Sequence, residues 1–85
     1  DNDSIRNAVQ AIDSALKACE LTEYKDISNV AALAAAYAAN QEYDKAIGWQ
    51  EKVVQAAPPE QHPFAQKMLD RYRDHLPFDA SLVAD

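Results

Sequence analysis

Few side chains in this 85-residue sequence are of the types that carry chemistry, and they are widely spaced. The two histidines, His62 and His75, lie 13 residues apart, so a zinc site would need ligands from another chain. The one cysteine, Cys19, falls on a predicted apolar helix face, where a thiol is buried and inert rather than nucleophilic. We therefore expect no metal site and no nucleophilic catalysis.

Paired carboxylates and phosphate-binding loops are the other chemistries to consider. Asp70 and Asp74 are one helical turn apart, but arginines at 71 and 73 alternate with them. This pattern favours a solvated helix surface with local ion pairs over acid–base catalysis. The single glycine excludes the glycine-rich loops that hold nucleotide phosphates. We predict that the chain has no catalytic residue, binds no cofactor and is not an enzyme.

Charge and hydropathy exclude two further classes of partner. The formal net charge is -6, with 14 acidic and 8 basic residues, whereas nucleic-acid binding normally needs clustered Lys and Arg. The longest strongly apolar window, residues 30–39, is about half the length of roughly 20 residues that spans a bilayer. We expect a soluble domain that binds neither nucleic acid nor a membrane.

The origin of the chain is only partly readable. Because it begins with Asp1 rather than Met, we expect a processed chain or a domain excised from a larger protein. A lone Cys19 cannot form an internal disulfide, which is compatible with the reducing cytoplasm, and an exported form stays open. The length allows at most one domain.

Apolar residues recur at helical spacing in four segments, which would position any functional surface. The predicted helices lie near residues 4–21, 27–40, 43–57 and 60–76, and residues 77–85 form a C-terminal tail. Asp26 or Ser28 can cap the second helix. Prolines at 58 and 59 end the third, and Pro63 is tolerated only in the first turn of the fourth. In the tail, Phe78, Leu82 and Val83 are the residues that could lie against the fourth helix.

The sequence also repeats itself with an offset of 35 residues. Ala11, Ile12 and Lys17 return as Ala46, Ile47 and Lys52, and Leu33, Ala34 and Tyr37 return as Met68, Leu69 and Tyr72. Two helix types therefore alternate, the first with the third and the second with the fourth. A period of this length is typical of helical repeat arrays.

One stretch, residues 27–60, resembles a complete tetratricopeptide repeat. Leu33 and Ala34 stand where that family has a Leu-Gly pair, and Tyr43 and Ala46 resemble the aromatic and small residues of its second helix. The resemblance implies antiparallel helical hairpins in a short right-handed solenoid, with the fourth helix as a terminal cap. The chain is also similar to repeats common in large bacterial multidomain proteins.

The resemblance covers about residues 5–76 and has two departures. Val30 stands where Trp is frequent, and Gln50 stands where a large apolar residue is usual, with Trp49 beside it. The register of the third helix is therefore open by one residue. Gly48 within a helix costs about 1 kcal/mol relative to alanine, and we expect a neighbouring backbone or ring to pack against it.

In this family the first helix of each repeat lines a concave face, which implies a binding groove. The expected groove residues are Ser28, Ala31, Ala35 and Ala38 on the second helix, and Gln66, Asp70 and Arg73 on the fourth. The alanines would form a shallow apolar wall with Arg73 as a polar anchor. Ala35 stands where members that clamp a terminal carboxylate have Asn, so we expect no such clamp. The alternative is that these alanines only favour helix and contact water.

The resemblance implies a protein-interaction scaffold that binds a peptide or a partner helix. The alternative, from another class, is a structural module that self-assembles through the unpaired apolar face of the first helix, which would recruit another copy or the rest of a longer chain. No motif supports an enzyme.

Overall fold

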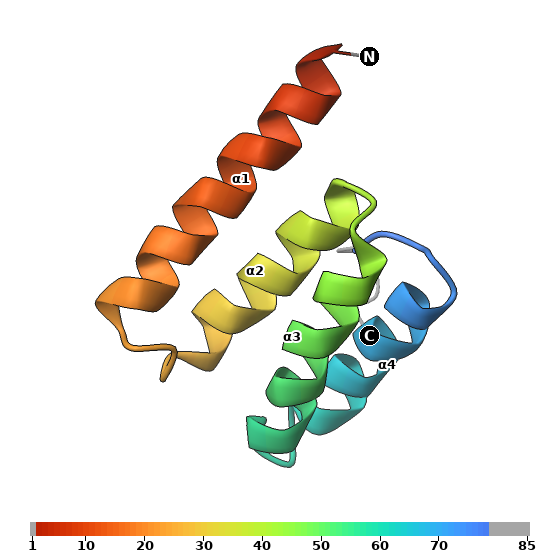
Figure 1. Ribbon diagram of the computed structural model, residues 1–85. Coiled ribbons are helices and arrows are strands. Elements are labelled where there is room, and N and C mark those ends of the chain that lie inside the picture. The colour runs from red at the N-terminus through yellow and green to blue at the C-terminus, as the bar shows by residue number, and fades with distance from the viewer. Residues whose placement is uncertain (1, 79–85) are drawn as a thin grey trace.

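A computed structural model of the chain has an all-α fold (Figure 1). The structure describes residues 2–78, with side chains from position 6 onward. Over this range the chain forms four helices and no strand, namely α1 (Asn2–Leu21), α2 (Ile27–Ala39), α3 (Tyr43–Ala56) and α4 (His62–Arg73). The predicted all-α class and the four helices are confirmed over these residues. Within residues 2–78, each helix is too short or too polar to cross a bilayer.

Local chemistry explains where these helices begin and end. α2 begins after Asp26, whose carboxylate accepts a hydrogen bond from the backbone N–H of Ser28 at 2.9 Å. This confirms Asp26 as the cap. α3 ends before the prolines at 58 and 59. α4 begins slightly later than predicted, with Pro63 in its first turn, and it ends at Arg73 rather than near residue 76.

Three helices end in the same hydrogen-bond pattern without using a glycine. The residue after the C-cap is Glu23, Gln41 or His75, with φ of 55°, 63° and 60° respectively. In each case the next backbone N–H reaches a carbonyl of the last turn, as Glu42 does to Tyr37 at 2.9 Å. This is the Schellman motif. A side chain in the left-handed region costs about 1 kcal/mol, because glycine alone adopts that region without steric strain.

The helices pack in chain order, α1 on α2, α2 on α3 and α3 on α4. Successive helices run in opposite directions, with α2 and α3 between α1 and α4 (Figure 1). α1 has 20 residues and α2 has 13, which makes α1 about 10 Å longer at 1.5 Å per residue. The first turns of α1 therefore extend past the end of α2 (Figure 1).

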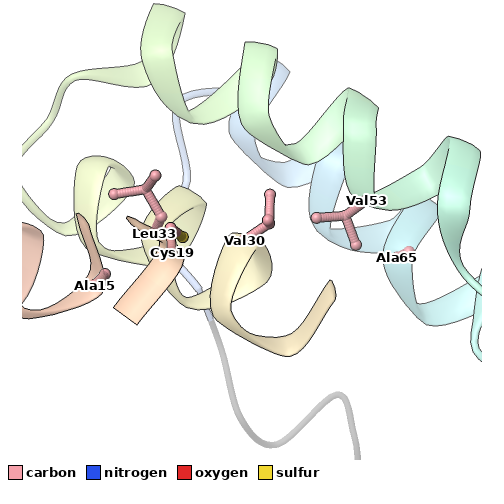
Figure 2. Packing of buried hydrophobic residues seen from close by; sticks show 6 residues of the cluster. All are labelled: Ala15, Cys19, Val30, Leu33, Val53 and Ala65. Carbon is pink, nitrogen blue, oxygen red and sulfur yellow. The ribbon is translucent and has the colours of Figure 1, made fainter. Parts of the chain in front are cut away.

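Two clusters of buried side chains hold the helices together. The first cluster joins all four helices and consists of Ala15, Cys19, Val30, Leu33, Val53 and Ala65. The second cluster joins α2, α3 and α4 and consists of Ala34, Ala38, Ala46, Met68 and Tyr72. Figure 2 shows Cys19 of α1 beside Leu33 of α2, and Val30 directed toward Val53 of α3. Although α2 and α4 are not consecutive, they share both clusters.

The 35-residue offset is also present in the burial of α2 and α4. Buried residues of α2 and their counterparts in α4 are Val30 with Ala65, Leu33 with Met68, and Ala34 with Leu69. The two helices therefore turn equivalent faces toward the core, as the repeated sequence predicts.

Gln50 settles the register of α3. Its side chain is 2% exposed, and its Nε2 donates a hydrogen bond to the backbone carbonyl of Ala65 at 2.9 Å. Trp49 is only half-buried, and its ring stacks on that of Tyr24 with centroids 5.3 Å apart. Gln50 thus occupies the core position. Its polar amide is tolerated there because its NH₂ group donates a hydrogen bond to the carbonyl of Ala65.

The expectation that a backbone or ring packs against Gly48 is wrong, because a Cβ at Gly48 would meet no atom within 4 Å. We expect Gly48→Ala to raise the free energy of unfolding by about 1 kcal/mol, the difference in helix propensity. Urea denaturation followed by circular dichroism measures this change. Ala32→Gly, at an exposed position within α2, is the matched reverse substitution and should lower stability by a similar amount. A destabilised Gly48→Ala would show that the space is not open.

Candidate binding groove between α2 and α4

A groove with a volume of about 540 Å³ lies where α2, α3 and α4 meet. Its apolar lining includes Ile27 and Ala31 from α2, Val53 from α3, and Phe64 and Met68 from α4. Its volume falls within the range of roughly 300–1,000 Å³ that is usual for ligand sites, and such sites have mostly apolar walls with a few polar groups.

α2 contributes two of its four predicted groove residues. Ser28 and Ala31 line the groove, whereas Ala35 is half-buried and is not part of the lining. The prediction that Ala38 is exposed is wrong, because Ala38 is buried in the second cluster. Ala38 lies one helical turn after the buried Ala34, so both side chains point into the core.

The three predicted residues of α4 are not part of the groove lining. Gln66 donates a hydrogen bond to Asp70 at 3.0 Å, and Asp70 lies 4.0 Å from Arg73. Arg73 also reaches Glu51 of α3, with Nη2 and Oε2 3.3 Å apart. Arg73 is therefore not part of the lining of this groove, and its guanidinium pairs with α3. These half-exposed ion pairs contribute little to stability.

Two buried polar side chains, Gln50 and Tyr72, line the groove in place of that anchor. Gln50 is held by its hydrogen bond to Ala65. Tyr72 is 1% exposed, and its hydroxyl has no hydrogen-bond partner among the described residues. Burial raises the pKa of Tyr72 to about 12, although the nearby charge of Arg71 acts in the opposite direction. The hydroxyl therefore carries its proton at neutral pH and can both donate and accept a hydrogen bond.

The sequence contained partial signals for both residues. Gln50 was visible as the polar departure from the family pattern, and Tyr72 was visible as the repeat of Tyr37. Neither signal indicates a groove, because the groove forms only when α3 and α4 bring these two positions beside α2.

Charged side chains at the groove balance one another. Glu60, which precedes α4, and Lys67 on α4 are the charged residues in its lining within the described part of the chain. One is acidic and the other basic, so the described residues of the lining carry no excess of either charge.

Phe78 forms part of the groove wall from beyond the end of α4. Its ring meets the ring of Phe64 edge-on, with centroids 6.4 Å apart and planes at 85°. Phe78 therefore lies against α4, as predicted. Leu82 and Val83, the other tail residues expected there, lie outside the described residues.

A scan against protein-family models, a search of the curated proteins and a search of the solved structures each give no match to this chain. The tetratricopeptide resemblance therefore remains a prediction from the residues. The groove is the feature from which function can be argued.

The residues considered for other chemistry are buried or separated. Burial, with a smaller contribution from the charge of Asp26, raises the pKa of the Cys19 thiol, and the side chain is completely buried. A thiol in this state is a poor nucleophile. His75 stacks on Tyr43 with centroids 4.9 Å apart. Among residues 6–78, no group of three His, Cys, Asp or Glu side chains could hold a metal ion.

α1 leaves some apolar side chains uncovered, which bears on the self-assembly alternative. Ala15 and Cys19 are buried, while Val9 and Leu21 are exposed. Leu21 is two residues after Cys19, about 200° around the helix at 3.6 residues per turn. Val9 and Leu21 therefore lie on different sides of α1, and these two side chains do not form one continuous apolar face.

Proposed function

We propose that this chain is a protein-interaction module that binds a peptide or a partner helix in the groove between α2 and α4. The observation that carries the proposal is the groove itself, with its volume of about 540 Å³, its apolar walls from three helices and its two buried polar side chains. Helical modules commonly hold a partner segment by apolar contacts in such a groove, with a few polar groups fixing its orientation.

The composition of α2 supports close approach of a partner. α2 contains no charged residue, and it lines the groove with Ile27 and with the small residues Ser28 and Ala31. Small side chains let a second backbone come near, and an uncharged surface costs little to remove from water. The equivalent faces of α2 and α4 further support a repeat-type arrangement, in which both helices contribute to one binding surface.

Two neighbouring alanines of α2 provide a matched test. Ala31 lines the groove, whereas Ala32 is exposed and is not in the lining. Peptides selected on the whole chain from a random phage-displayed library should bind Ala31→Glu more than tenfold more weakly, because the peptide would bury the introduced carboxylate. Ala32→Glu should change the affinity by less than about twofold. Isothermal titration calorimetry measures both dissociation constants.

Amide chemical shifts of the labelled chain complete the test. Shifts should be concentrated at the residues of α2, α3 and α4 that line the groove. Shifts confined to α1, or equal loss of affinity in the two glutamate variants, would place the binding site elsewhere and contradict the proposal.

A further inference from the structure

The hydroxyl of Tyr72 forms no hydrogen bond with another described residue of the chain. Within the described residues, every buried side-chain N or O atom that is cut off from solvent has a hydrogen-bond partner. The Tyr72 hydroxyl has no partner, so it must reach solvent. The residue is 1% exposed and lines the groove, and we infer that the hydroxyl reaches solvent there.

Phenylalanine would fill the same core position without the hydroxyl. A hydroxyl placed in apolar surroundings is unfavourable unless it forms a hydrogen bond. The other buried members of the second cluster have apolar side chains, namely Ala34, Ala38, Ala46 and Met68. A partner in the groove would supply the missing hydrogen bond and explain why tyrosine stands at this position.

Gln50 places a second polar group in the groove lining, beside Ala65 of α4. Its carboxamide is fixed to the carbonyl of Ala65, and Tyr72 is seven residues further along α4. Seven residues of helix rise about 10 Å, at 1.5 Å each. Three residues of extended chain span about the same length, at 3.3 Å each. An extended peptide that runs along α4 therefore needs about three residues to pass from the level of Ala65 to the level of Tyr72.

The charges of the lining indicate the character of the partner. Among the described residues of the lining, Glu60 and Lys67 carry opposite charges and the others are apolar or neutral. Described walls with one charge of each sign offer little electrostatic gain to a strongly acidic or basic segment, which would lose hydration on entering the groove.

We propose that the Tyr72 hydroxyl and the Gln50 carboxamide hydrogen-bond to the main chain of an uncharged, extended peptide segment, whose bulky apolar side chain fills the groove between them. This inference rests on the proposed function and adds to it the chemical class of the partner and the residues that select it.

Three substances titrated into the labelled whole chain test the proposal: the capped tripeptide acetyl-Leu-Ala-Phe-amide, the same peptide with a free C-terminal carboxylate, and toluene. The neutral peptide should shift groove amides, and Tyr72→Phe should weaken its binding about fivefold, which corresponds to one neutral hydrogen bond. Toluene should bind both proteins equally. The carboxylate peptide should bind more weakly than the neutral one.

Tyr37→Phe is the matched control. Tyr37 is the counterpart of Tyr72 in the repeat, but its ring lies under Lys45, 5.5 Å from Nζ, and outside the groove lining. This variant should keep the affinity of the original chain. Thermal denaturation should show that Tyr72→Phe is at least as stable as the original chain, so a loss of binding cannot be attributed to unfolding.

Each other outcome has a distinct meaning. Groove shifts with equal peptide affinity in the original chain and Tyr72→Phe would overturn the polar pair and leave the groove function standing. Toluene binding without peptide binding would contradict the proposal that the partner is a peptide, because the groove would then be a cavity for small molecules.

Tighter binding of the carboxylate peptide would contradict the proposal that the partner is uncharged. If none of the selected or designed peptides shifts groove amides, the proposed function itself fails.

Discussion

Replacing Leu33 with alanine should lower the free energy of unfolding by about 3 kcal/mol. Leu33 is 0% exposed and belongs to the cluster that joins all four helices. Its truncation leaves a cavity between α1 and α2 that the neighbouring Ala15 and Cys19 are too small to fill. The cost therefore includes both the lost burial and the cavity itself.

This loss is a large share of the total, since a domain of this size has a stability of roughly 5–10 kcal/mol. The melting temperature should fall by roughly 15 °C, as measured by circular dichroism at 222 nm. Leu21→Ala is the matched control, because Leu21 is 87% exposed at the end of α1, and it should change stability by less than about 0.5 kcal/mol. Equal effects of the two substitutions would mean that α1 does not pack on Leu33.

The helices and their inner faces were predictable because both depend on short-range periodicity. Leu33 and Ala34 were placed on the inner face of α2, and the 35-residue offset carried the same assignment to Met68 and Leu69 in α4. Apolar side chains at helical spacing can be buried on only one side, so the pattern fixes the face without knowledge of the partner.

The outer faces were harder to predict, because exposure depends on which helix lies alongside. Arg73 was assigned to the groove by adding 35 to Ala38, yet Ala38 is in the core and Arg73 pairs with Glu51 on α3. A long side chain such as arginine can reach either neighbour of its helix. Its direction is then decided by tertiary contacts that no spacing rule contains.

The role of Gln50 in the groove also depends on tertiary contacts that the sequence does not reveal. From the sequence, Gln50 is a departure from the family pattern, because nothing in the sequence shows which group its amide will bond. In the structure that group is the backbone carbonyl of Ala65. Every residue carries a backbone carbonyl, so the sequence gives no indication of which one will be close to a given side chain. Only the packing of α3 on α4 turns this glutamine into a satisfied core residue that also lines a groove.

Glycine placement leads to the second large expected effect. The only glycine, Gly48, stands within α3, where packing does not require it, while Glu23 and Gln41 adopt the left-handed conformation that glycine favours. The double substitution Glu23→Gly and Gln41→Gly should raise the free energy of unfolding by about 2 kcal/mol, or about 1 kcal/mol for each strained residue relieved. The two positions follow different helices, so their effects should add. Urea denaturation of the single and double variants measures the gain.

His75→Gly provides the control that separates backbone strain from side-chain contact. His75 has the same left-handed φ, but its ring stacks on Tyr43 at 4.9 Å. Glycine would relieve the strain and remove a stacking contact of about 0.5–1.5 kcal/mol, so the net change should be close to zero. If the Glu23 and Gln41 variants also showed no gain, backbone strain would not be what limits these helix ends. If all three gained equally, the stacking of His75 on Tyr43 would contribute nothing. A gain at Glu23 and Gln41 alone is the result that the geometry of the three helix ends requires.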